Sequence, residues 1–111
     1  MPFHAGPVHE VKANLFRVLG HPARVRILEL LRDGERSVGS LQADLELDSG
    51  GTSQHLAALR RIGLVTSRRD GTSVYYRVED EGVFDLLAAG RAIITRRLAT
   101  EQSLLHELES E

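Results

Sequence analysis

The side chains best suited to contacting a nucleic acid gather in one central stretch of the chain, from Gly50 to Thr72. Gln54 carries an amide that can pair with both hydrogen-bonding groups of adenine in the major groove. Ser53 and the backbone amides at the start of a helix can together hold a phosphate. The candidate contacts are Gly50, Gly51, Ser53, Gln54, His55, Arg61, Arg68, Arg69 and Thr72.

A helix is expected over the first part of this stretch, ending at Gly63. At 3.6 residues per turn, Thr52, Leu56 and Leu59 fall within one narrow arc with Gly63, and this side is expected to pack against the core. Small residues on the other side would let the backbone approach a groove closely. That side carries Gly50, Ser53, Gln54, Ala57 and Arg61.

A basic hairpin is expected directly after the helix. Residues 64–69 predict one strand and residues 72–78 the returning strand. Asp70-Gly71 between them favours a two-residue type I′ turn. Arg68 and Arg69 lie next to this turn and would reach phosphates or the adjacent minor groove. A short helix followed by a cationic hairpin is the layout of a winged helix-turn-helix, and it predicts binding to double-stranded DNA.

The distribution of charge supports this reading although the net charge is −2. The stretch from Gly50 to Val78 holds five arginines and one acid, Asp70, and is therefore strongly basic. The chain from Glu79 onward holds eight acids and three arginines. Local charge, rather than the total, steers a protein to a phosphate backbone. We expect the protein to meet DNA with one surface only.

Four further helices complete the predicted fold, which is mainly α with a small β-hairpin in the order ααααββα. The first spans Val8 to Gly20, with Gly20 expected to end it in a left-handed conformation. The second begins at Pro22 with His21 as its cap, and the third is capped by Ser37. The last spans Gly82 to about Glu109 and would be roughly 40 Å long, beyond the ~30 Å diameter of a small domain.

A helix of that length needs another surface to cover its apolar side. We expect this cover to be a second copy of the chain, so that the first and last helices form a homodimer. The residues expected at the dimer interface are Leu15, Leu19, Ile94, Leu98 and Leu105.

Size and composition set the remaining limits. A chain of 111 residues predicts one winged-helix domain, with residues 1–7 as a flexible N-terminus. The absence of cysteine excludes disulfides, thiolate metal sites and thiol redox switches. There is no secretory signal pattern and no apolar run long enough to cross a bilayer, so a cytoplasmic protein without membrane association is expected.

Three segments together resemble the arsenical-resistance repressor (ArsR/SmtB) family of bacterial winged-helix regulators. They are LGHPARVRILELL (residues 19–31), SQHLAALRRIGLV (residues 53–65) and RRDGTSVYYRV (residues 68–78). The resemblance covers roughly residues 15–80. It implies a homodimeric repressor that binds an inverted repeat in promoter DNA, often its own promoter, and releases it when an effector binds.

The chain departs from this family at the metal sites of its best-known sensors. Those sensors use a cysteine pair near the third helix, or an Asp-x-His with two later His/Glu ligands on the last helix. Here the third helix has no cysteine, and on the last helix Asp85 is followed by two leucines. No metal or other cofactor is therefore expected. A metal-responsive repressor with an atypical His/Glu site is the alternative, with candidates His4, His9, Glu10, His106 and Glu107.

Two other function classes fit the sequence less well. An enzyme is not expected, because Ser53 and His55 point in nearly opposite directions on a helix and no carboxylate is placed to orient the histidine. A winged helix that binds protein instead of DNA would have an apolar outer face on the fourth helix, and this sequence does not. The identity of an effector, the operator sequence, the regulated genes and the choice between repression and activation stay open.

Overall fold

A computed structural model of the chain describes residues 6–47 and 49–111. The chain divides into two compact units, Met1–Glu81 and Gly82–Glu111, which are described one at a time. His4 and most of the expected flexible N-terminus lie outside the described residues.

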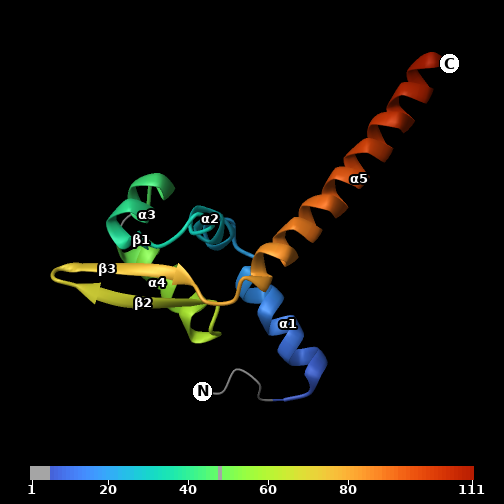
Figure 1. The fold of residues 1–111 in the computed structure, drawn as a ribbon. Helices are drawn as coiled ribbons and strands as arrows, with labels where there is room; N and C mark the ends of the chain where they lie inside the picture. The colour runs from blue at the N-terminus through green and yellow to red at the C-terminus, as the bar shows by residue number, and fades with distance from the viewer. Residues whose placement is uncertain (1–5, 48) are drawn as a thin grey trace. The chain divides into compact units, whose positions relative to one another are not determined.

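The first unit holds a small sheet and the bundle of helices around it (Figure 1). The sheet is antiparallel with strand order β1-β3-β2. The elements are α1 (Val8–Leu19), α2 (Pro22–Leu30), β1 (Arg36–Ser37), α3 (Val38–Leu45), α4 (Ser49–Arg61), β2 (Val65–Asp70) and β3 (Ser73–Val78). The expected order lacked β1, because two residues are too few to show the alternation that reveals a strand.

The core of this unit comes from the apolar sides of α2, α3 and α4. These helices pack against one another, and α3 and α4 also contact the sheet. Burial of each large aliphatic side chain stabilises the fold by about 1.5–3 kcal/mol. The fully buried side chains are Ile27, Leu28, Leu41, Leu56, Leu59, Val65 and Thr52.

The helix ends show how the sequence sets the boundaries. His21 accepts a hydrogen bond from the Ala23 amide, and Ser37 accepts one from the Ser40 amide, so both expected N-caps are confirmed. Gly63 has a positive φ of 80° and ends α4 as expected. Gly20 is the C-cap of α1, so it also ends its helix as expected. Its φ is −78°, however, so the left-handed conformation predicted for it is wrong.

The hairpin turn differs from the prediction by one residue. Asp70 pairs with Ser73, so Gly71 and Thr72 form the two-residue turn. Gly71 has a φ of 63°, whereas Thr72 does not have a positive φ. A type I′ turn needs a positive φ at both positions, and a type II′ turn needs it only at the first, where glycine is preferred. The φ values therefore fit type II′. Glycine suits its first position because glycine occupies the left-handed region without a steric cost.

The second unit is one long helix, α5 (Gly82–Ser110), of 29 residues. At 1.5 Å per residue it is about 44 Å long. Its apolar residues repeat at helical spacing yet remain exposed within this chain: Ile93, Ile94, Leu98, Leu104, Leu105 and Leu108. Within the described ranges, no helix is both long and apolar enough to cross a membrane.

Candidate nucleic-acid interface

The outer side of α4 is mostly open to solvent between Gly50 and Arg61. Thr52, Leu56 and Leu59 are fully buried, which confirms these three members of the expected inner arc. Gly63, the fourth, lies beyond the end of α4 and is exposed. Gly51 is partly buried. The exposed residues are Gly50, Ser53, Gln54, Ala57, Arg60 and Arg61. These side chains are small, polar or basic, so the helix presents a thin face with hydrogen-bonding groups and positive charge.

His55 lies at the edge of this face and is held by α2 and its cap. Its Nδ1 accepts a hydrogen bond of 3.1 Å from the Nε of Arg24. Its ring also lies 4.2 Å from that of His21, between ring centroids, at a tilt of 47°. Burial, followed by the charges of His21 and Arg24, lowers the pKa of His55 from its usual value of 6.5. Sequence reasoning missed Arg24, because its partner lies 31 residues away and no periodicity joins them.

Acidification is expected to destabilise the fold through His55. Because folding lowers this pKa, the unfolded state binds more protons in the interval between the folded pKa and 6.5. The contribution to stability is thus complete above pH 6.5 and is lost as pH falls through the folded pKa. Urea unfolding at about pH 7.5 and about pH 5.5 measures this loss. The His55→Asn variant keeps an acceptor near the Nδ1 position and does not titrate, so it should lose less stability. An equal loss in parent and variant would contradict the assignment.

Arg68 is tied to an acid from a distant part of the chain. Its Nε and Nη2 donate to the two carboxylate oxygens of Glu35 at 2.8 and 2.6 Å. Its guanidinium also lies 4.6 Å above the ring of Tyr75. The hydrogen bond from Arg68 lowers the pKa of Glu35, and the same bond raises the pKa of Arg68. The hairpin is thereby fixed to the segment before β1. Sequence reasoning missed Glu35 for the same reason as Arg24.

Arg69 lies on the other face of the hairpin, since consecutive residues of a strand point to opposite faces. It pairs across the strands with Val74, is exposed, and has no ion-pair partner within the part of the chain that the structure describes. Thr72 is exposed in the turn itself. The hairpin ends in this turn, away from the helices of the first unit (Figure 1). Of the two arginines next to the turn, Arg68 and Arg69, only Arg69 has its guanidinium free for a new partner.

The residues expected at a dimer interface differ in their exposure. Ile94, Leu98 and Leu105 are exposed along α5, and Leu15 is partly exposed on α1. Leu19 is only 6% exposed and belongs to the core of its own chain, so it offers little surface to a second copy, and its place at the interface stays a prediction. Phe16, its neighbour on α1, is 56% exposed and was not singled out.

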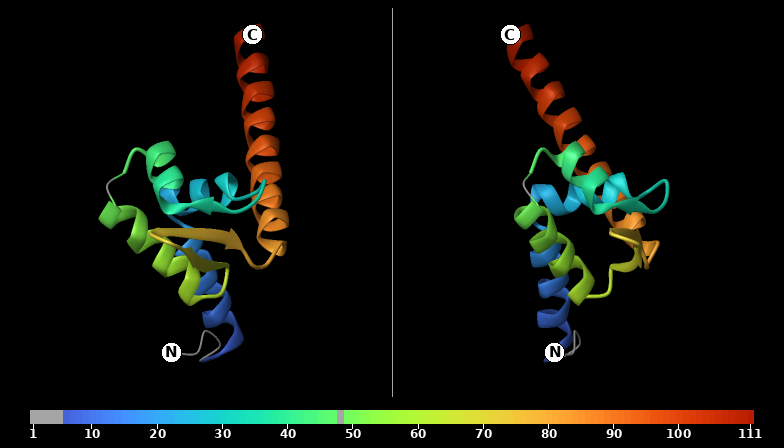
Figure 2. Two further views of the ribbon diagram at one scale, coloured as in Figure 1. Left: turned by 60° about the vertical axis from the view of Figure 1, so that its left-hand side comes forward. Right: turned by 90° about the vertical axis from the view of Figure 1, so that its left-hand side faces the viewer.

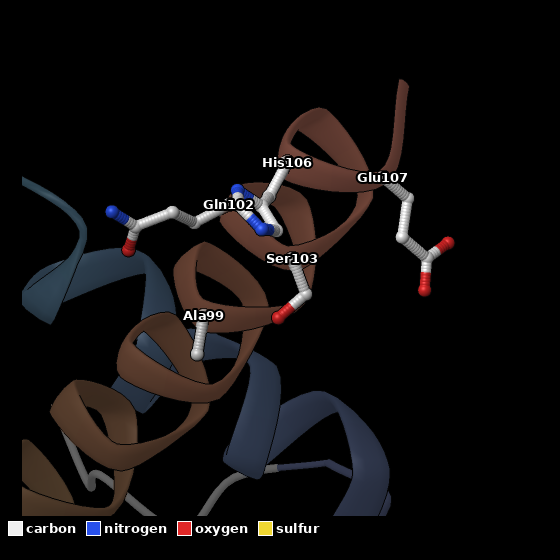
Figure 3. A pocket seen from close by; sticks show the side chains of 5 residues that line it. All are labelled: Ala99, Gln102, Ser103, His106 and Glu107. Carbon is white, nitrogen blue, oxygen red and sulfur yellow. The ribbon is translucent and has the colours of Figure 1, made fainter. Parts of the chain in front are cut away.

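The histidines that the structure describes do not gather with acids into a metal site. Across residues 6–47 and 49–111, no three His, Asp or Glu side chains lie close enough to hold a metal ion. An open hollow on the surface of α5 is lined by Ala99, Gln102, Ser103, His106 and Glu107, and all five come from this one helix. Figure 3 shows the Gln102 and Glu107 side chains extending to opposite sides of it. The hollow is therefore the outer surface of a helix. A His/Glu site shared by two copies stays a prediction.

Comparison with known proteins identifies the fold and the family. The model of the bacterial regulatory proteins of the arsR family matches residues 21–67. Rv0081 of Mycobacterium tuberculosis, described as an uncharacterised HTH-type transcriptional regulator, is 42% identical over 94% of this chain and 92% of its own length. Its crystal structure superposes with a TM-score of 0.79 at 43% identity, covering 87% of this chain and 98% of that one.

Other relatives extend the comparison. A winged helix-turn-helix DNA-binding domain from Mycobacterium bovis, Mb0332, is homodimeric in solution and superposes with a TM-score of 0.68 at 35% identity, covering 78% of this chain and 80% of that one. The biofilm growth-associated repressor of Agrobacterium fabrum is 38% identical over 73% of this chain and 69% of its own length. The transcriptional activator HlyU of Vibrio cholerae is 42% identical over 62% of this chain and 64% of its own length.

These relatives are transcriptional regulators rather than enzymes. The similarity to Rv0081 extends over nearly the whole chain and includes α4 and the β2–β3 hairpin. The chain therefore belongs to the ArsR family of bacterial winged helix-turn-helix transcriptional regulators.

Proposed function

We propose that this chain is a homodimeric repressor that binds an inverted repeat in promoter DNA, placing α4 in the major groove and the β2–β3 hairpin on the adjacent backbone. The outer face of α4 is the observation that carries this proposal. The major groove is about 12 Å wide and admits one helix. Small residues such as Gly50 and Ala57 let α4 approach closely, while Gln54 and Arg61 supply donors.

The same face argues against a protein-binding winged helix. The core of a protein-binding surface is depleted in charge and enriched in aromatic residues. The exposed side of α4 instead combines glycine, serine and glutamine with Arg60 and Arg61.

The apolar side of α5 supports the dimer. Leu98, Leu105 and Ile94 are each more than half exposed within one chain, and such residues ordinarily mark an interaction surface when they are contiguous. A second copy presents the same stripe, as a symmetric interface requires. Two copies then offer two α4 helices, which fits two half-sites of opposite direction.

A mobility-shift assay on the upstream region of the chain's own reading frame tests the function. The parent protein should shift a fragment that contains an inverted repeat, with two protomers per fragment, and should bind it far more tightly than random DNA. A reporter driven by that promoter should rise when the protein is removed. Failure to shift any palindromic fragment at low salt would refute DNA binding, and a fall in reporter output would make the protein an activator.

Arg68 and Arg69 should differ in their effect on the salt dependence of DNA affinity. Each phosphate contact adds about −0.9 to the slope of log affinity against log salt, so Arg69→Ala should make the slope of a dimer shallower by about 1.8. Titrations at several salt concentrations measure this. The matched control is Glu35→Gln with Arg68→Met, which removes the ion pair without leaving a lone charge and should keep the parent slope. An unchanged slope in Arg69→Ala would exclude Arg69 as a phosphate contact.

A further inference from the structure

Arg24 bridges α4, which the proposed function places in the major groove, and α1, which is expected at the dimer interface together with α5. Its Nη1 donates to the backbone carbonyl of Val18, in the last turn of α1, at 3.2 Å. Its Nε donates to the Nδ1 of His55, in the middle of α4, at 3.1 Å. Both hydrogen bonds are partly buried. α1 and α4 lie next to each other in the first unit (Figure 2).

The chemistry of the two contacts makes the bridge stiff. The guanidinium is planar and holds its donors in a fixed fork, so the two acceptors cannot shift independently of each other. The carbonyl of Val18 belongs to the last turn of α1, where carbonyls lack partners within the helix and a positive charge is favourable. His55, on α4, is held from a second side because its ring lies against the ring of His21. His21 is itself fixed as the N-cap of α2.

The bridge also determines the protonation of His55. A ring nitrogen that accepts a hydrogen bond carries no proton, so the neutral ring has its proton on Nε2. The contact therefore needs an acceptor at the Nδ1 position and nothing else from the ring. An asparagine at this position can supply such an acceptor, whereas a leucine cannot.

We infer that Arg24 is a positioning residue that sets the groove-facing side of α4 relative to α1, and through it the separation of the two α4 helices in the dimer. The inference rests on the proposed function. His55 directly follows Ser53 and Gln54, so a shift of α4 at His55 moves both of these exposed side chains. Half-sites of a twofold operator lie about one helical turn apart, roughly 34–36 Å, so a dimer with fixed α4 helices rejects operators of the wrong spacing.

Arg24→Lys tests this on full-length protein with three DNA fragments. Lysine keeps the charge, but its single ammonium cannot reach both acceptors with the geometry of the fork. The first fragment carries the inverted repeat, the second has one base pair inserted between its half-sites, and the third is random. We expect Arg24→Lys to bind the inverted repeat roughly 5- to 20-fold more weakly than the parent. It should also discriminate less against the inserted base pair, with the same salt slope and the same affinity for random DNA.

The controls separate positioning from other roles. Arg26→Lys makes the same change two residues away, at an exposed side chain whose partner is Glu29 on its own helix, and should behave as the parent. His55→Leu should reproduce the loss, His55→Asn should restore most of the affinity, and Arg24→Lys with His55→Leu should be no worse than the poorer single variant. If Arg24→Lys does not fold, the comparison of His55→Leu with His55→Asn still decides the question.

Three results would overturn the inference while leaving the proposed function intact. They are parental affinity and spacing preference in Arg24→Lys, additive losses in the double variant, and equal weakening on all three fragments with a shallower salt slope. The last would make Arg24 a phosphate contact. A parent protein that binds none of the fragments would instead refute the proposed function.

Discussion

Leu98→Glu is expected to convert the dimer to a monomer and to reduce binding to the inverted repeat by more than about a hundredfold. Leu98 is 59% exposed on α5 within one chain, and the dimer proposal buries it against a second copy. A twofold interface receives the substitution twice, so two carboxylates would enter one apolar surface. The effective cost of burying an unpaired charge is several kcal/mol for each ion. Light scattering after size-exclusion chromatography and a mobility-shift titration measure the two effects.

The matched control for this variant is Ser103→Glu. It adds the same charge to the same helix, roughly 140° around the axis from Leu98 at 3.6 residues per turn. Ser103 is exposed and lies beside the open hollow of α5 (Figure 3), outside the apolar stripe. It should remain dimeric and bind DNA as the parent does. If Leu98→Glu gives a folded monomer that binds the inverted repeat normally, the dimer does not use this side of α5.

The sequence was most informative where local periodicity decides the structure. The division of α4 into a buried arc at Thr52, Leu56 and Leu59 and an exposed face around Gln54 follows from the helical repeat alone. Capping by His21 and Ser37 was equally readable, because a cap bonds to an amide only two or three residues away.

Contacts between residues far apart in the sequence could not be predicted from periodicity or capping. Arg68 was expected to reach a phosphate, and only the fold shows that Glu35 already holds it on one face of the hairpin. The pairing of Arg24 with His55 was hidden for the same reason. Leu19 illustrates a different limit: an apolar stripe on a helix does not reveal whether a given leucine faces its own core or a second copy. In the structure, Leu19 is buried and Phe16 beside it is exposed.

Gln54→Ala is expected to remove most of the preference for the inverted repeat over random DNA. Gln54 is exposed on α4 between the exposed Ser53 and the fixed His55, so its amide is carried by a well-positioned helix. A bidentate contact of this kind discriminates against a wrong base by about 1–3 kcal/mol, and a dimer loses two such contacts. The specific complex should therefore weaken by roughly 30-fold or more, because 1.4 kcal/mol corresponds to about a factor of ten.

Whether Gln54→Ala loses affinity for the inverted repeat alone or for random DNA as well shows whether Gln54 contacts a base or a phosphate. Binding to random DNA depends on phosphates, so it should not change, and the salt slope should stay parental. Gln102→Ala makes the same substitution at an exposed position of α5 and serves as the control. Competition titrations with the inverted repeat and with random fragments give the ratio directly. Because an alanine at residue 54 still leaves the small, basic face of α4 able to enter a groove, the variant should bind DNA while ceasing to select its sequence. Equal weakening on both fragments would instead assign the Gln54 amide to the phosphate backbone.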